Sequence, residues 1–302
     1  KALVKVYEGA DGALAGFTKL FADEDMAVKT RLLTAEAMFE LAKSHRESGQ
    51  KELAEKEIAE GKAILEEAIA DYPNTAHAPH AELLLANLAQ ALENYEEAVT
   101  RYDKVISNWP NSEFAPKAML RKAICQEKVG DFENALDTYV ELTYSYPNSP
   151  LVSDAVVRLG QYFYKTGKYE IAGKIFGNFQ ERNPAHELAA KTLFLSGQSY
   201  MKGAEERKKT TGGKYDPTAL QWLNEGIERF NKLINTYEDK DLRAEAMYWL
   251  ADSYMKVQDP KRAYQSFKKL TWDYPETKWA KFARGQLVQN AKVFERFETD
   301  AE

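Results

Sequence analysis

A short motif containing a proline recurs along the chain at a constant interval. The prolines of the first four copies are 37 residues apart, at Pro73, Pro110, Pro147 and Pro184. Glu238 replaces the proline of the next copy, and Pro275 follows it by another 37 residues. A fixed period of this size is typical of a solenoid, in which like units stack on their neighbours.

Each interval contains two segments with the 3.6-residue apolar period of an amphipathic helix, separated by a short turn. In the second segment a small residue is followed four residues later by an aromatic one, as at Ala98 and Tyr102. The same pair recurs at Ala135 and Tyr139, Ala172 and Phe176, Gly226 and Phe230, and Ala263 and Phe267. Residues four apart share a helix face, so the small residue allows two helices to approach and the aromatic ring fills the space beside it. We expect the Asn, Ser or Thr after the proline to cap the next helix.

The period predicts an all-α chain that forms one solenoid of about seven helix pairs over residues 1–302. The predicted boundaries are a partial first repeat at 1–24, repeats at 25–74, 75–111, 112–148, 149–185, 186–239 and 240–276, and a capping helix with a tail at 277–302. Repeat 25–74 is longer by about two helical turns. Repeat 186–239 carries an insertion at 203–218, which Gly212-Gly213 and Asp216-Pro217 predict to be a loop. Because the sequence opens inside a helix pair, we expect further residues upstream of Lys1 in the natural protein.

Two repeats show a full set of marker residues at fixed offsets. They are Leu159-Gly160, Phe163, Ala172, Phe176 and Pro184, and Leu250-Ala251, Tyr254, Ala263, Phe267 and Pro275. This pattern resembles the tetratricopeptide repeat, with three residues more than the usual length of about 34. The resemblance implies a right-handed α-solenoid whose partners are other proteins or peptides.

The Tyr-Pro-Asn-Ser junctions resemble those of bacterial envelope tetratricopeptide proteins. Examples are the outer-membrane-assembly lipoprotein and the Tol-Pal-associated periplasmic coordinator. The resemblance implies a protein of the bacterial periplasm or one associated with the envelope, and a cytoplasmic location is the alternative.

Composition and motifs exclude several other classes. A net charge of −6 disfavours nucleic-acid binding, which needs a basic surface to displace counterions. No apolar run approaches the roughly 20 residues of a transmembrane helix. The sequence contains no phosphate-binding loop, nucleophile elbow or zincin motif. We therefore predict a protein without catalytic residues, metal or cofactor.

Two features with the residue types of a chemical site receive a structural interpretation. His77 and His80 lie three residues apart but Pro79 separates them, and Glu82 is the only close carboxylate, too few ligands for zinc. We interpret the two histidines as part of a solvated turn where a helix begins. The single cysteine, Cys125, rules out an internal disulfide and is interpreted as a small buried residue at a helix contact.

The remaining candidate is the concave side, which the first helices line in tetratricopeptide stacks. The predicted groove residues are Asn87, Lys117, Arg121, Arg158, Gln161, Tyr164, Lys165, Gln198, Trp249 and Asp252. Arg121 and Arg158 occupy equivalent places in adjacent repeats, and Lys117 and Lys165 extend them to a basic strip. Such a strip can hold an acidic or C-terminal peptide through charge-assisted hydrogen bonds. The alternative is an ordinary solvated helix face.

Three functional hypotheses follow. The first is a non-catalytic protein–protein interaction scaffold in a larger bacterial cell-envelope assembly. The second is a structural subunit of a homo-oligomer or filament, because an open end of a stack exposes apolar surface. The third is the recruiting or regulatory segment of a larger enzyme.

Overall fold

The computed structural model describes residues 24–298, which divide into two compact units between Leu151 and Val152. Within this range every regular element is an α-helix, which confirms the all-α prediction. None of the described helices is both long and apolar enough to span a bilayer. The predicted partial first repeat at 1–24 lies outside the described residues except for its last residue, and one continuous solenoid over 1–302 stays a prediction.

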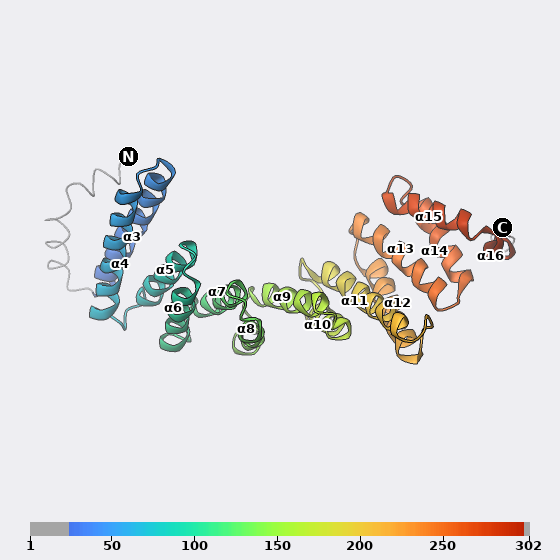
Figure 1. Ribbon diagram of the computed structural model, residues 1–302, viewed down its shortest axis with the longest axis horizontal. Coiled ribbons are helices and arrows are strands. Elements are labelled where there is room, and N and C mark those ends of the chain that lie inside the picture. Colours follow the sequence, from blue (N-terminus) through green and yellow to red (C-terminus); the bar gives the residue numbers. More distant parts are fainter. Residues whose placement is uncertain (1–23, 299–302) are drawn as a thin grey trace. The chain divides into compact units, whose positions relative to one another are not determined.

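The first unit contains three antiparallel helix pairs among its described residues (Figure 1). Its helices are α3 (Glu24–Glu47), α4 (Lys51–Asp71), α5 (Ala78–Ala91), α6 (Tyr95–Asn108), α7 (Ala115–Lys128) and α8 (Phe132–Ser145). Each helix packs on the next one in the sequence, and α5 also contacts α3 and α7. The pair α3 and α4, with 24 and 21 residues against 14 in α5 and in α6, confirms that repeat 25–74 is lengthened.

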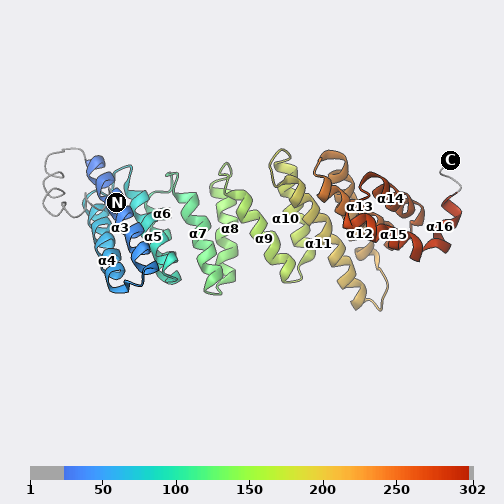
Figure 2. The ribbon, with the colours of Figure 1, turned by 90° about the horizontal axis from the view of Figure 1, so that it is seen from above.

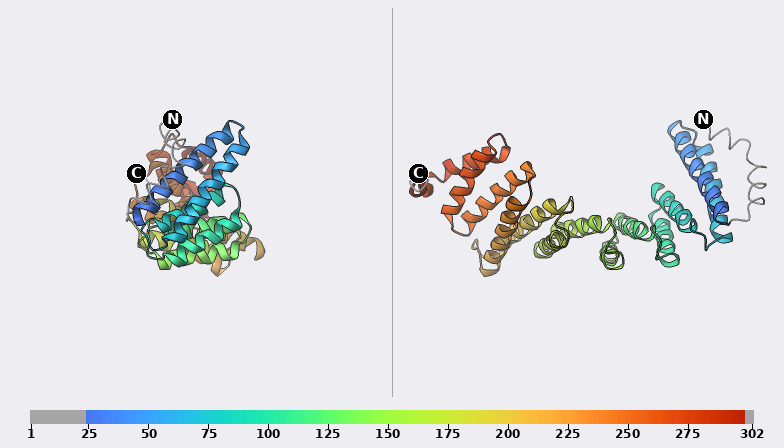
Figure 3. Two further views of the ribbon diagram at one scale, coloured as in Figure 1. Left: turned by 90° about the vertical axis from the view of Figure 1, so that its left-hand side faces the viewer. Right: turned by 180° about the vertical axis from the view of Figure 1, so that it is seen from behind.

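The second unit continues the same alternation. Its helices are α9 (Val152–Lys165), α10 (Tyr169–Arg182), α11 (Ala189–Thr210), α12 (Pro217–Thr236), α13 (Lys240–Lys256), α14 (Pro260–Asp273), α15 (Lys278–Gln289) and α16 (Ala291–Glu298). The first helices of successive pairs also touch, α11 with α13 and α13 with α15. Figure 3 shows α13, α14 and α15 side by side.

The small and aromatic residues of the repeat pack as the sequence predicts. Ala98 and Tyr102 are both fully buried between helices of the first unit. In the second unit Gly160 of α9 lies directly under the ring of Phe176, and Gly197 of α11 lies under Phe230. A Cβ atom built on Gly197 would stand 2.8 Å from that ring. Glycine thus permits an approach that alanine would obstruct.

The turns inside the helix pairs share one conformation. Gly130 and Gly167 have φ values of +83° and +79°, in the left-handed region that glycine adopts without strain. After α7, the Asp131 amide donates to the Gln126 carbonyl at 2.9 Å, which satisfies a carbonyl at the helix end. Glu93 occupies the equivalent place after α5 with φ of +61°, an unfavourable angle for a residue with a side chain.

The capping prediction for the junctions is wrong at two of them. No side chain caps α5 or α7. Instead the hydroxyl of Thr75 donates backward to the Tyr72 carbonyl at 3.1 Å, and Ser112 donates to the Trp109 carbonyl at 2.8 Å. Each helix begins three residues after its hydroxyl residue, at Ala78 and Ala115, so the hydroxyl does not cap it. The hydroxyl instead stabilises the turn that contains the proline. Thr277 does cap α15, accepting from the Ala280 amide at 3.2 Å.

The insertion at 203–218 is not one loop. Helix α11 continues to Thr210 and α12 begins at Pro217, so most of the added residues lengthen the two helices (Figure 2). Asp216 caps α12 by accepting from the Ala219 amide at 2.9 Å. Arg207 holds the same carboxylate through its Nε, 2.8 and 2.9 Å from the two oxygens. This pair fixes the turn between the two long helices.

The predicted single capping helix at the C-terminal end is also divided. It breaks at Asn290, and the short α16 turns back onto α14. Phe294 of α16 is buried, with its ring centroid 5.4 Å from that of Tyr264. Two helices in place of one thus cover the last repeat, and Val288 beside the break remains 79% exposed.

Candidate functional site

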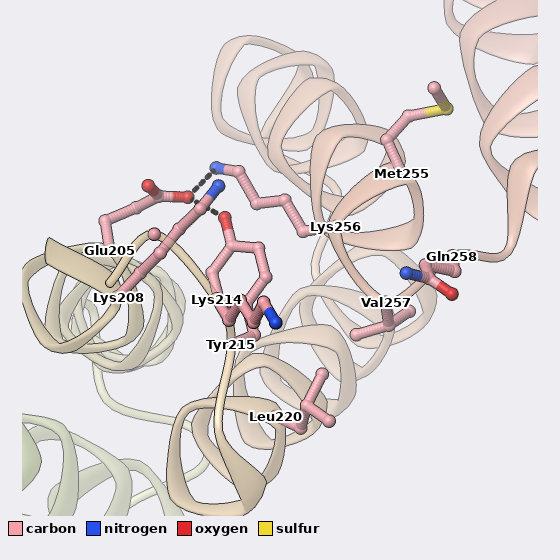
Figure 4. Close-up of a pocket in the computed structure, with 10 residues that line it drawn as sticks. Glu205, Lys208, Lys214, Tyr215, Leu220, Met255, Lys256, Val257 and Gln258 are labelled. Carbon is pink, nitrogen blue, oxygen red and sulfur yellow. Dashed lines mark hydrogen bonds and ion pairs between the residues drawn. The ribbon is translucent and has the colours of Figure 1, made fainter. Parts of the chain in front are cut away.

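The lengthened pair α11 and α12 forms one side of an open pocket of about 920 Å³ in the second unit (Figure 4). The end of α11, the following turn, the start of α12 and the end of α13 line it. The lining residues are Glu205, Lys208, Gly213, Lys214, Tyr215, Leu220, Met255, Lys256, Val257 and Gln258. Two extra helical turns and the short turn between them place these groups together.

A closed ionic network forms one wall of the pocket. The Lys256 ammonium lies 2.9 Å from Glu205 Oε1 and 2.6 Å from Asp252 Oδ2. The Tyr215 hydroxyl donates to the same Glu205 oxygen, and Figure 4 shows Lys256 and Tyr215 both directed at that carboxylate. The network joins α11, the inserted turn and α13.

Contacts within the network shift the pKa values of Lys256, Glu205 and Tyr215. Burial alone would lower the pKa of Lys256, but the charge of Asp252 and the hydrogen bonds that the ammonium donates to both carboxylates raise it instead. Burial alone would raise the pKa of Glu205, but the bonds from Tyr215 and Lys256 lower it. Burial and the hydrogen bond to Glu205 raise the pKa of Tyr215. These shifts move the pKa values of Lys256, Glu205 and Tyr215 further from neutral pH.

Two further lysines line the pocket without a carboxylate partner. Lys208 lies with its ammonium 4.3 Å from the centre of the Tyr215 ring, and Lys214 follows on the turn. Within residues 24–298 no carboxylate lies within ion-pair distance of either lysine. These two cations are the part of the pocket that remains open to a ligand.

The groove residues predicted in the second unit lie in several environments. Asp252 belongs to the Lys256 network, and Trp249 lies in an aromatic cluster of α13 and α15, 6.2 Å from Trp279. Tyr164 packs edge-on against Tyr169 at 5.2 Å. Arg158 is partly buried on α9 and Gln198 on α11, while Gln161 and Lys165 are exposed on α9. None of these residues lines the pocket, although Asp252 contacts a lining residue, Lys256.

In the first unit the structure brings two predicted residues to one hydroxyl group. Asn87 Oδ1 of α5 lies 2.8 Å from the buried Tyr102 hydroxyl, and Arg121 of α7 lies against the same group. Lys117 is exposed, with its ammonium 5.2 Å from the centre of the Phe114 ring. Asn87 therefore orients a core tyrosine. The basic strip from Lys117 to Lys165 includes residues of both units and stays a prediction.

Sequence reasoning missed the pocket lysines and the network beside them. A signal was present, because Lys208 and Lys214 lie in the one large departure from the 37-residue period. The pairing of Glu205 with Lys256 was not readable, since 51 residues separate them and α12 intervenes.

The cysteine and the histidines have structural surroundings. Cys125 is buried in the core of the first unit, as predicted, and burial raises the pKa of its thiol to about 11. His80 stacks on the Phe114 ring at 4.8 Å, and burial lowers its pKa. His77 lies 3.5 Å from Asp25. Among the described residues no group of three or more His, Cys, Asp or Glu side chains is placed to hold a metal ion.

Stacked helix pairs with a small residue under an aromatic ring define a tetratricopeptide-repeat protein. A family model described as a tetratricopeptide repeat-like domain matches residues 24–172. The model of the outer membrane lipoprotein family YfiO matches residues 115–299, more than half of the chain. The chain belongs to this outer membrane lipoprotein family.

Several solved structures of tetratricopeptide proteins are similar to the chain. YrrB, described as having an unusual peptide-binding site, is 18% identical, with a TM-score of 0.46 over 73% of this chain and 97% of its own. PilF of Pseudomonas aeruginosa is 14% identical, with a TM-score of 0.39 over 85% and 99%. MamA of Desulfovibrio magneticus RS-1 is 18% identical, with a TM-score of 0.42 over 66% and 97%. Comparison with curated protein sequences gives no significant match.

Proposed function

We propose that this protein is a non-catalytic scaffold that holds another protein within a bacterial cell-envelope assembly. The match of more than half of the chain to an outer membrane lipoprotein family carries the proposal. Tetratricopeptide families are in general non-catalytic and bind proteins or peptides. In such stacks each repeat buries its apolar surface on its neighbours, which leaves an extended face for a partner.

The partner surface of this proposal is the exposed side of the first helices. In the second unit the first helices carry the exposed Gln161 and Lys165 of α9 and the partly buried aromatic pair of Trp249 and Trp279. Aromatic side chains with polar residues around them are typical of protein interfaces. The basic residues Lys117 and Arg121 of the first unit, with Arg158 and Lys165 of the second, are the proposed contacts of an acidic or C-terminal segment.

Affinity purification of the natural full-length protein from the detergent-solubilised envelope of its own cells tests this function. The proposal predicts one protein at a constant ratio to the bait, lost when the bait is heat-unfolded before mixing. Fractionation of the same cells should place the protein with the envelope. A folded bait that recovers no protein, or a protein found only in the cytoplasm, contradicts the proposal.

A second candidate function is self-association through the last helices. Three apolar side chains are strongly exposed there: Trp272 at 86%, Val288 at 79% and Phe282 at 50%. A self-associating face would cover such residues. Light scattering of the purified chain distinguishes the two candidates, because a strict monomer at micromolar concentration excludes a homo-oligomeric structural subunit.

A further inference from the structure

The pocket between α11, the inserted turn and α13 supports a more specific inference about the partner. We propose that it binds an acidic segment of the partner protein, through a carboxylate side chain held by Lys208 and Lys214 and an adjacent apolar side chain. This inference rests on the proposed scaffold function and names the chemistry of one contact within it.

The pocket is not a consequence of stacking repeats. The pairs α5 with α6 and α7 with α8 are joined by turns of three residues, and 14-residue helices suffice for their packing. The pair α11 and α12 extends beyond that length, as α3 and α4 do, and turns back at Gly212 and Gly213 between its two helices. The extension therefore has no part in the basic repeat, and a binding site explains why this repeat has it.

Within residues 24–298, most cations in and beside the insertion form ion pairs, but two lysines do not. Arg207 pairs with Asp216 at 2.6 Å, and Lys202 and Lys209 pair with Glu206 at 2.8 and 2.9 Å. Lys208 and Lys214 are the two cations of the insertion that form no ion pair within 4 Å among the described residues, although the charge of Lys208 contributes to the lowered pKa of Glu205, and both line the pocket.

The carboxylates near these lysines are already engaged. Glu205 accepts from both Tyr215 and Lys256, and Asp252 holds Lys256 from the other side. Both carboxylates are therefore already paired with the Lys256 ammonium, whereas Lys208 and Lys214 form no ion pair with any residue that the structure describes. Because an apolar wall strengthens the attraction between opposite charges, an anionic group gains most at this place.

The opposite wall supplies the apolar part of the contact. Leu220 of α12 is 37% exposed, and Met255 and Val257 of α13 line the pocket with it. Figure 4 shows Leu220 and Val257 below Tyr215, away from the Glu205 carboxylate. A pocket of about 920 Å³ holds a few residues of a peptide, so an Asp or Glu next to a large apolar residue fits both walls.

Selection from a library of random peptides on the full chain tests this proposal. The wild-type protein and the double charge reversal Lys208→Glu/Lys214→Glu are used as separate targets. The matched control is Lys232→Glu/Lys269→Glu, which makes the same charge change at exposed residues of α12 and α14 outside the pocket. Circular dichroism and melting temperature verify that all three targets are folded.

We expect peptides selected on the wild type and on the control to be enriched in Asp or Glu beside an apolar residue. Their affinity should fall by roughly tenfold or more on the pocket variant. A benzophenone side chain at Leu220 should crosslink to these peptides. Replacement of their Asp and Glu by Asn and Gln should abolish both effects.

Two outcomes overturn the inference in distinguishable ways. If peptides are selected but show no acidic enrichment, or bind the pocket variant equally, the scaffold binds peptides at another surface and this inference alone fails. If no peptide is enriched on any folded target, both the pocket inference and the peptide-binding part of the proposed function fail.

Discussion

The Tyr146 hydroxyl donates a hydrogen bond of 2.8 Å to the carbonyl oxygen of Pro110, the proline of the preceding junction. Trp109 Nε1 donates in the same way to the Pro73 carbonyl at 3.0 Å. In the second unit the Tyr237 hydroxyl donates to the Pro184 carbonyl at 2.9 Å, across the lengthened repeat. At these three places an aromatic donor links one junction to the proline carbonyl of the junction before it, which gives this part of the recurring motif a physical reason.

Replacement of Tyr146 by Phe tests the energetic role of this link. The free energy of unfolding of the Tyr146→Phe variant should be about 1 kcal/mol lower than that of the wild type, because the hydrogen bond is lost while the ring remains. Chemical denaturation of the full chain gives the difference. Tyr144→Phe is the matched control, since Tyr144 is 80% exposed in the last turn of α8, just before Tyr146, and should change stability by only a few tenths of a kcal/mol. If the two variants are equally stable, the hydrogen bond between Tyr146 and Pro110 does not stabilise the protein.

Gly160 tests the close approach of α9 to Phe176. Gly160→Ala should lower the free energy of unfolding by about 1 to 2 kcal/mol, because crowding of the Phe176 ring outweighs the gain of about 1 kcal/mol in helix propensity. Gly285→Ala in α15 is the control, as nothing lies within 4 Å of the added Cβ there, and it should stabilise the protein. A stabilised Gly160→Ala variant would contradict the packing described here.

The positive φ of Glu93 predicts that glycine at this position stabilises the protein. Glu93→Gly should raise the free energy of unfolding by about 0.5 kcal/mol, because glycine removes the strain of a positive φ at the place where Gly130 and Gly167 stand in later turns. Glu96→Gly, three residues later within α6, should instead destabilise by about 1 kcal/mol. Thermal melts measure the change in melting temperature of each variant, which should be positive for Glu93→Gly and negative for Glu96→Gly. Changes of the same sign would contradict the conformation assigned to the turn.

A buried ion network in the first unit predicts a pH dependence. The Arg101 guanidinium lies 3.4 Å from the buried Glu82 and 2.9 Å from Glu97. Burial raises the pKa of Glu82, and the Arg101 charge opposes this rise. The hydrogen bond from Arg101 lowers the pKa of Glu97. Arg101→Met should therefore cost about 3 kcal/mol at pH 7, where Glu82 is left ionised and buried without its partner.

The cost of Arg101→Met should shrink as the pH falls from 7 toward 4. In the variant the folded protein takes up a proton on Glu82 above the unfolded pKa, which relieves the buried charge. In the wild type the lowered pKa of Glu97 contributes stability that is lost as the pH falls from the pKa of unfolded Glu97 through its lower pKa in the folded protein. Both effects reduce the difference in free energy of unfolding between the wild type and the variant. Lys56→Met, at the exposed pair with Glu60, is the control and should cost less than about 0.5 kcal/mol at any pH. Denaturation at several pH values that shows a constant gap would contradict this account.

The 37-residue period was sufficient to predict the helix pairs, because packing of small residues such as Ala98 against rings such as Tyr102 repeats with the sequence. The junction caps were mispredicted, since Thr75 and Ser112 satisfy a carbonyl before the helix in place of an amide inside it. Composition marked the insertion as a loop, because two glycines and a proline lie near its end. Its first half instead continues α11 to Thr210, and Gly203 there lies against Tyr169 and Trp222.

The candidate site was only partly predictable. Asp252 was identified from the repeat frame, but Glu205, the second carboxylate that pairs with Lys256, lies in the extension of α11. The difference between the paired Lys209 and the unpaired Lys208 depends on the rotation of the last turns of α11. A sequence that gives three consecutive cations, Arg207, Lys208 and Lys209, does not specify which one points into a pocket.

In-cell photocrosslinking tests the central claim, a scaffold that holds another protein, most directly. A benzophenone side chain is placed either at Gln161, exposed on the first helix α9, or at Asn178, exposed on the second helix α10. The account predicts a covalent adduct with one envelope protein from position 161 and far less from position 178. Equal labelling from both positions, or no protein adduct from either in cells that contain folded protein, would contradict it.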